Sequence, residues 1–281
     1  MATGLSERVT TTTEWWDVDG VPLETHAWNL SSWGGSRQSV PVMRGADEVL
    51  PGRSGKRWRP KQPDSRTIEL SGWVIGADLY GTPVDQQRFR ENWSVLKRLL
   101  WNPDREVLLT RRWIENGQLM AATGRAQFSA GLSPQMTGPT RATWAAQMVM
   151  ADPFFYSAPV KIDLAPNAVT SAIIPGDYAS ERMLIRSDLG YGQINLTQTT
   201  TDPDVAFSIS IPQATPAALN VDVHEFTMTG TTSGGSTIRL NSTMSHSGSP
   251  LMFSVPPGIA SIARSGSFGS AVWLEYQPAW L

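Results

Sequence analysis

The sequence predicts a mainly β protein of two domains, with one packed helix in the N-terminal domain and strands alone in the C-terminal domain. Apolar and polar residues alternate with a period of two along residues 66–76 and in many shorter stretches, as they do in half-buried strands. Apolar residues recur with a clear helical spacing only over residues 83–101. These two patterns define the fold class.

Composition places the boundary between the domains near residues 152–159. A chain of 281 residues favours two domains, and ten of its twelve tryptophans precede residue 157. Up to Tyr156 there are 18 Lys and Arg against 16 Asp and Glu, whereas the remainder holds 5 and 9 with many Ser, Thr and Gly residues. We therefore expect domains at 1–156 and 157–281.

The N-terminal domain should contain several strands and two tight hairpins. Asp19-Gly20 and Asn116-Gly117 each lie between apolar residues, which is the strongest short signal for a two-residue hairpin turn. Strands are expected over residues 24–32, 66–76, 105–112, 122–130 and 142–150. In the strand over 66–76, Ile68, Leu70 and Val74 should share the buried face.

The helix is expected to begin after Thr82, which can serve as its N-cap. Pro83 would be the first helical residue, and Asp85 would complete a capping box. Asn102-Pro103 should end the helix, because a proline restricts the residue before it. One face of the helix carries four apolar side chains: Phe89, Trp93, Leu96 and Leu100.

The C-terminal domain divides into short candidate strands separated by turn residues, a spacing typical of an all-β sandwich or jelly roll. The candidates cover residues 160–164, 182–186, 193–197, 206–211, 218–228, 236–240, 251–255, 261–265 and 271–277.

A basic run over residues 52–66 should form an extended loop or arm, since its glycines and prolines disfavour a helix or a regular strand. Three interpretations remain open: a solvated loop, an arm on an acidic surface of another subunit or partner, and a nucleic-acid contact. Only Trp58 could stack on bases, so the last is the weakest. The candidate interface residues are Arg53, Lys56, Arg57, Trp58, Arg59 and Lys61.

Composition and motifs argue against several functions. A net charge of −2 disfavours a dedicated nucleic-acid binder, and the absence of cysteine excludes disulfides and thiolate chemistry. No apolar stretch is long enough for a membrane span, and we expect synthesis in a cytoplasm without a signal peptide. The three histidines are far apart and no catalytic motif is complete. We expect no enzyme activity, no cofactor and no metal.

Several short motifs resemble, in their order and spacing, one family: the distal tail proteins of long, flexible-tailed (siphovirus-type) bacteriophages, especially those that infect actinobacteria. The N-terminal motifs are VDGVPL at 18–23, Trp28, LPGRSG at 50–55, DSRTIELSGWVIG at 64–76, the helix with Phe89, Asn92, Leu96 and Leu99, and ADPFF at 151–155. The C-terminal ones are LNVD at 219–222, Pro257-Gly258 and EYQPAWL at 275–281.

This resemblance implies a ring-forming N-terminal domain and a galectin-like β-sandwich at the C-terminus. It also implies a structural virion protein at the tail tip, made in the host bacterial cytoplasm. The implied assembly is a hexameric ring, single or stacked, that joins the major tail tube protein to a tail-associated hub or fibre protein. In this picture the basic run is a belt between neighbouring subunits.

Two other functions remain open from the residues alone. The first is a host-glycan adhesin that acts through residues 160–281, with Trp273 and Trp280 as the tryptophans available to stack on sugars. Because both lie in the final strand, packing in the core or an interface is favoured over sugar binding. The second is a glycan hydrolase, to which no particular residue points.

Overall fold

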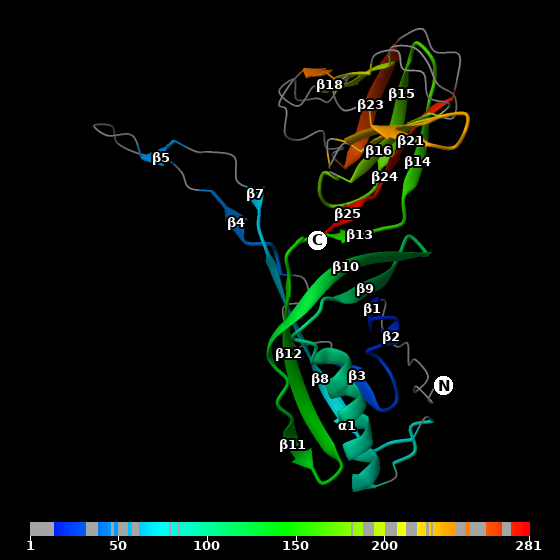
Figure 1. Ribbon diagram of the computed structural model, residues 1–281. Helices are drawn as coiled ribbons and strands as arrows, with labels where there is room; N and C mark the ends of the chain where they lie inside the picture. The colour runs from blue at the N-terminus through cyan, green and yellow to red at the C-terminus, as the bar shows by residue number, and fades with distance from the viewer. Residues whose placement is uncertain are drawn as a thin grey trace. The chain divides into compact units, whose positions relative to one another are not determined.

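The computed structural model describes residues 14–31, 39–45, 48–49, 56–57, 62–78, 80–83, 85–180, 182–187, 194–199, 207–211, 218–222, 225, 227–239, 245–247, 257–265 and 271–281 (Figure 1). The chain divides into two compact units. Unit 1 is Met1–Phe155 together with Leu281, and unit 2 is Tyr156–Trp280. The protein is mainly β, as predicted, and its one described helix lies in unit 1.

Unit 1 is organised by a twisted antiparallel sheet with the strand order β2-β1-β9-β10-β12-β8-β3. A further strand, β11, pairs with β12, and β13 (Phe155–Tyr156) lies where the two units join along the chain. The bounds are β1 Glu14–Val18, β2 Val21–Pro22, β3 Trp28–Leu30, β8 Arg66–Ile75, β9 Val107–Glu115, β10 Gln118–Gly131, β11 Gln135–Gly138 and β12 Arg141–Met150.

The pairing of β8 with β12 runs without interruption from Arg66 opposite Met150 to Ile75 opposite Arg141. Every second residue of each strand points into the core, so Ile68, Leu70 and Val74 are buried, as their alternation predicts. A strand has a side-chain period of two, so a one-residue slip would turn this whole set to solvent. Burial therefore specifies the register.

Both predicted hairpins are confirmed. Asp19 and Gly20 connect β1 to β2 with φ values of 49° and 77°, and Asn116 and Gly117 connect β9 to β10 with φ values of 50° and 77°. Two successive left-handed residues are what a type I′ turn needs, and Asn, Asp and Gly adopt them most readily.

The helix α1 (Gln86–Leu100) begins three residues later than predicted. Asp85 is the N-cap, and its carboxylate accepts a hydrogen bond from the Arg88 backbone N–H at 2.7 Å. The predicted cap at Thr82 is wrong because that residue closes a tight turn. In this turn the Asp78 carboxylate accepts from the backbone N–H groups of Tyr80 and Thr82 at 2.9 and 2.8 Å. The end before Asn102-Pro103 is as predicted.

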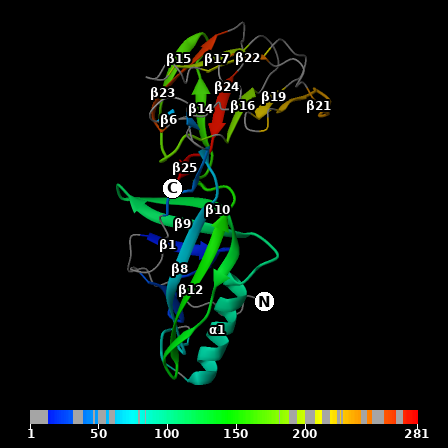
Figure 2. The ribbon, with the colours of Figure 1, turned by 90° about the vertical axis from the view of Figure 1, so that its left-hand side faces the viewer.

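The face of α1 that packs on the sheet differs from the prediction at one position (Figure 2). Phe89, Leu96 and Leu100 are buried as expected, but Trp93 is only half-buried and Asn92 is buried in its place. The Asn92 side-chain amide donates to the carbonyl oxygens of Ile75 and Ala77 at 2.8 and 2.9 Å. These two carbonyls lie where β8 ends, so one polar side chain ties the helix to the strand.

Unit 2 consists of two antiparallel sheets that share one hydrophobic core. The first has the order β14-β24-β16-β19-β20-β21 and the second β15-β23-β17-β18-β22. Buried side chains of both sheets, such as Ile185 and Leu274 of the first and Ile174 and Ile262 of the second, form a single cluster. Two sheets packed in this way make a β-sandwich.

Most predicted strands of unit 2 are confirmed. The range 218–228 is wrong as a single strand, because it holds β19 and the start of β20, and the range 251–255 lies outside the described residues. β15, β22 and β25 were not predicted. The bounds are β14 Val160–Leu164, β15 Ala168–Ile174, β16 Met183–Ser187, β17 Ile194–Thr199, β18 Phe207–Ile211, β19 Ala218–Asp222, β20 Thr227–Thr231, β21 Thr237–Arg239, β22 Ser245–Ser247, β23 Gly258–Ser265, β24 Val272–Tyr276 and β25 Ala279–Trp280.

Replacing Asn92 by Ala should destabilise unit 1. The change removes both hydrogen bonds from the helix to the end of β8 and leaves two carbonyls without these donors, which costs about 2–3 kcal/mol in unfolding free energy. Urea unfolding followed by tryptophan fluorescence measures the loss. Gln87→Ala, an exposed change on the same helix, is the matched control. Equal midpoints for the two variants would contradict this role of Asn92.

Candidate assembly surfaces

A two-stranded ribbon precedes β8. Its foot pairs β4 (Met43–Arg44) with β7 (Gln62–Pro63), and its outer part pairs β5 (Glu48–Val49) with β6 (Lys56–Arg57) (Figure 1). Backbone hydrogen bonds from Val42 N to Ser65 O at 3.1 Å and from Asp64 N to Val42 O at 2.7 Å continue the ladder below the foot. Neither pair joins another strand in the described part of the chain. We call residues 40–65 the arm.

The predicted interface residues all belong to the arm. Lys56 and Arg57 form β6, whose side chains are not described, and the other four lie outside the described residues: Arg53, Trp58, Arg59 and Lys61. The expectation that glycine and proline prevent any regular strand here is wrong at residues 56–57 and 62–63. A two-stranded ladder accepts a proline wherever no N–H is needed for pairing.

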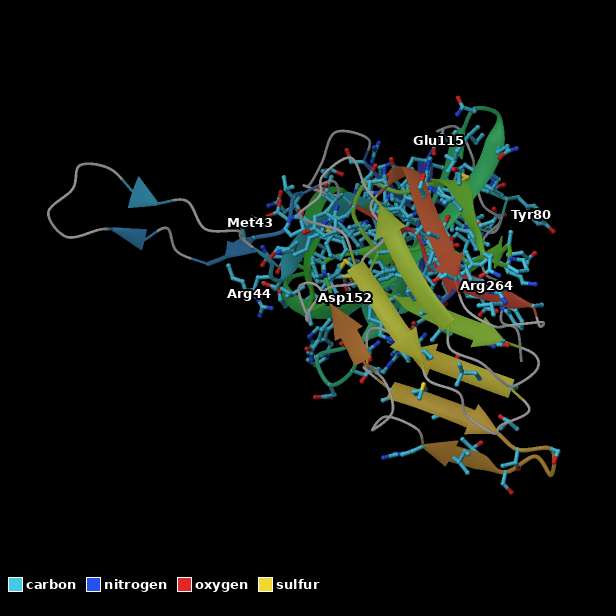
Figure 3. All side chains as sticks on the ribbon, turned by 90° about the horizontal axis from the view of Figure 1, so that it is seen from above. Met43, Arg44, Tyr80, Glu115, Asp152 and Arg264 are labelled. Carbon is cyan, nitrogen blue, oxygen red and sulfur yellow. The ribbon has the colours of Figure 1, made fainter. Side chains whose placement is uncertain are left out.

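Apolar side chains at the foot of the arm face solvent in the single chain. Val40 is 75% exposed, Val42 63% and Met43 46%, and Figure 3 shows Met43 and Arg44 where the arm begins. A ribbon of two strands is marginally stable by itself in water. Neighbouring exposed apolar residues on such a ribbon are typical of a surface that another molecule covers. The sequence run Val-Pro-Val-Met at 40–43 carried this signal, but sequence analysis did not single it out.

Below the foot, Arg66 anchors the arm in the core of unit 1. Its side chain is 1% exposed, and its guanidinium carbon lies 5.4 Å from the centre of the Phe155 ring. Phe155 in turn packs edge-on against Trp16 at 5.5 Å. Burial, together with the nearby charge of Arg111, lowers the pKa of Arg66 to about 10. The group is still charged at neutral pH, so the first residue of β8 is a buried cation stacked on an aromatic ring.

Ion pairs connect β1 and β9 across their shared ladder. Asp17, 2% exposed, pairs with Arg112 at 2.8 Å, and Glu14 pairs with Arg111 at 3.3 Å. Arg111 also donates to the backbone oxygen of Leu281 at 2.7 Å, which holds that residue in unit 1. These contacts link the side chains of β1 to β9 and tie Leu281 to β9.

The hairpin between β9 and β10 presents a second exposed apolar pair. Ile114 and Leu119 lie directly opposite each other in the ladder, next to the Asn116-Gly117 turn, and are 50% and 60% exposed. Sequence analysis identified this turn but not the apolar pair beside it. The pair is a second exposed apolar site of unit 1.

The two tryptophans considered for sugar stacking occupy different settings in unit 2. Trp280 is 7% exposed and its indole N–H donates to the Ser157 hydroxyl at 2.6 Å. Trp273 is half-buried, with the Lys161 ammonium 4.6 Å from its ring centre and its indole N–H bonded to Glu275 at 3.0 Å. Trp280 thus has little free ring face, and the face of Trp273 is partly occupied by a lysine.

A pocket of about 400 Å³ opens on unit 2 near these residues. Charged groups of both signs line it, including Arg182, Arg186, Asp222 and Glu275, and Arg186 and Glu275 are paired with each other at 3.1 Å. This mixture of paired charges does not select one kind of ligand.

Among the described residues, no three His, Cys, Asp or Glu side chains gather closely enough to hold a metal ion. Nor does the described part of the chain contain a helix that is long and apolar enough to cross a membrane.

The fold is similar to that of a solved bacteriophage protein. The chain matches the crystal structure of the Dit protein (gp 19.1) of phage SPP1, described as a paradigm of the hub of the adsorption apparatus in phages that infect Gram-positive bacteria. The TM-score is 0.59 at 13% sequence identity, and the match covers 96% of this chain and 100% of that one.

Two structures of the phage p2 baseplate in its activated conformation, with Sr and with Ca, match with TM-scores of 0.41 at 7% and 9% identity. Each match covers 95% of this chain and 98% of the other, but the scores are too low to indicate a shared fold. No protein-family model matches the sequence, and no curated protein matches it.

The partly buried Asp17–Arg112 pair and the exposed Asp163–Lys161 pair should respond differently to the loss of a charge. Asp17→Asn should lower the unfolding free energy by about 1–3 kcal/mol, because it removes a nearly buried partner of Arg112. Asp163→Asn makes the same chemical change in the exposed pair with Lys161 and should cost at most about 0.5 kcal/mol. Urea unfolding of both variants tests the difference, and equal losses would refute it.

Proposed function

We propose that this protein is a structural component of a bacteriophage tail tip, a distal tail protein that joins the tail tube to the adsorption apparatus. The observation that carries the proposal is the likeness of the fold to SPP1 Dit along both chains. Because the match covers 96% of this chain and 100% of the other, it includes both units and is not limited to one shared β-sandwich. The order of short motifs in the sequence supports the same family independently.

In the proposed assembly, copies of the chain form a closed ring of six, single or stacked. The partners on its two sides are the major tail tube protein and a tail-associated hub or fibre protein. The protein acts without catalysis, as part of the virion, after synthesis in the host bacterial cytoplasm.

The arm is the proposed contact between neighbouring subunits. Its foot exposes Val40, Val42 and Met43, and the same segment of the sequence contains most of the basic run. Apolar residues that lose water on docking supply binding energy, whereas charges mainly orient the partners and speed their encounter. The arm offers both kinds of contact in one segment, so it suits the role of a belt.

The mass of the purified protein in solution tests the ring. Six chains of 30.7 kDa amount to about 184 kDa, which light scattering distinguishes readily from a monomer, and negative-stain images should show closed rings. If a ring forms, Val42→Asp should shift the mass toward the monomer, because it places a charge where the foot of the arm loses water. The expected loss in association is at least about tenfold.

Ser94→Asp is the matched control for Val42→Asp, because it adds the same charge to an exposed position of α1. It should leave the ring intact. A Val42→Asp variant that assembles as well as Ser94→Asp would refute the role of the arm. A wild-type chain that stays monomeric at high concentration, both alone and with the tail tube protein, would refute the ring.

A further inference from the structure

The edge strand β15 of unit 2 has an unusual outer surface. It ends the five-stranded sheet, with β23 as its only strand neighbour in the described part of the chain, and Figure 2 shows the two strands side by side. On an outward face that normally carries polar residues, Val169 is 63% and Ile173 82% exposed. The whole strand, Ala-Val-Thr-Ser-Ala-Ile-Ile, holds neither a charge nor a proline.

Natural sheets protect their edges from pairing with other chains by short strands, charges or prolines. The neighbouring strand β14, at one end of the other sheet, follows this rule with Lys161 and Asp163, which form an ion pair at 2.9 Å. β21, at the opposite end of that sheet, is three residues long and ends in Arg239. β15, with seven residues, has none of these protections.

The two exposed apolar side chains of β15, Val169 and Ile173, lie two residues before and two residues after Ser171. If two copies of β15 pair antiparallel with Ser171 opposite Ser171, then Val169 of each copy lies opposite Ile173 of the other. The exposed apolar residues then meet each other on one face, and Thr170 lies opposite Ala172 on the other face. Cross-strand apolar pairs of this kind stabilise a sheet, and a two-fold contact needs a surface that is complementary to itself.

We propose that β15 is a self-association edge, at which the five-stranded sheets of two copies of this chain join into one continuous sheet through antiparallel β15–β15 pairing centred on Ser171. The occupant is a second copy, because the exposed face of β15 is complementary to itself: each exposed apolar residue of one copy lies opposite an exposed apolar residue of the other. The uncharged edge imposes no electrostatic penalty on pairing with itself. This inference is independent of the proposed function, because it rests on unit 2 alone.

The first test uses the absence of cysteine from the chain. Directly opposed residues of an antiparallel pair have Cα atoms about 4.5–5.5 Å apart, within the range of a disulfide. Ser171→Cys, at the exposed centre of β15, should therefore form a covalent dimer of the full-length protein under mild oxidation, seen as a band of twice the mass on a non-reducing gel. Thr237→Cys on the exposed edge strand β21 is the control and should remain mostly monomeric.

Charge pairs introduced into the Ser171→Cys chain then test the register. Val169→Lys with Ile173→Lys places lysines opposite lysines in the proposed pairing and should lower the dimer yield at least about tenfold. Val169→Lys with Ile173→Glu places Lys opposite Glu at both positions and should restore most of the yield. Both substituted positions are well exposed in the single chain, so the fold should tolerate either set, which circular dichroism checks.

The two charge variants also exclude other modes of contact. In a parallel pairing in register, Lys would face Lys and Glu would face Glu, so both variants would be equally weak. Equal dimer yields for the two variants, or a yield for Ser171→Cys no higher than for Thr237→Cys, would overturn the proposal. The ring proposal stays separable, because Val42→Asp acts on the arm and should leave the disulfide at position 171 unchanged.

Discussion

The continuous pairing of β8 with β12 is the constraint on which the rest of unit 1 depends. Its register places Ile68, Leu70 and Val74 in the core, and the same strand carries the buried cation Arg66 at one end. The other end, at Ile75, supplies a carbonyl to which Asn92 of the helix is bonded. A shift of register would therefore displace three things at once: the core residues, Arg66 at the base of the arm, and the Ile75 carbonyl that accepts from the helix.

Because the register of β8 is fixed, β8 can hold the base of the arm in one position. The arm itself consists of very short strand pairs, which cannot hold a position by their own hydrogen bonds. Its direction comes from Arg66, which is packed on Phe155, and from the backbone bonds between residues 42 and 64–65. Anchoring the base of the arm in the core fixes part of its geometry, and a segment whose geometry is fixed in advance binds a partner at a lower entropic cost.

Much of the architecture could be predicted from the sequence, because alternation, hairpin dipeptides and helical spacing are local signals. The start of the helix was wrong because Pro83, a good first helical residue, instead forms a bridge with Ala77, and this depends on the preceding turn. Asn92 was missed on the buried face because its partners are backbone carbonyls distant in sequence. β15 was missed because Val169 and Ile173 are apolar on the outward face, which removes the alternation that marks a half-buried strand.

The candidate assembly surfaces were harder to predict, because the exposure of their residues depends on tertiary structure. The basic run in the arm was visible as composition, but the exposure of Val40 and Val42 depends on which strands flank them, and the sequence does not state this. Likewise, the Ile114–Leu119 pair has the composition of a buried ladder and lies instead near the tip of a hairpin. Whether a residue is exposed depends on the tertiary fold. Local sequence patterns therefore do not identify exposed apolar residues.

Two glycines, Gly72 in β8 and Gly76 directly after it, lie so close to neighbouring backbone that they should be retained when most of the sequence has changed. A methyl group on Gly72 would lie 1.9 Å from the backbone oxygen of Asn29, and one on Gly76 would lie 2.3 Å from that of Asp85. Both neighbouring atoms belong to the backbone, which cannot move away as a side chain can. Even alanine, the smallest replacement, therefore does not fit at these positions unless the backbone shifts. Among distant relatives that keep β3 and α1 against β8, these two positions should change last.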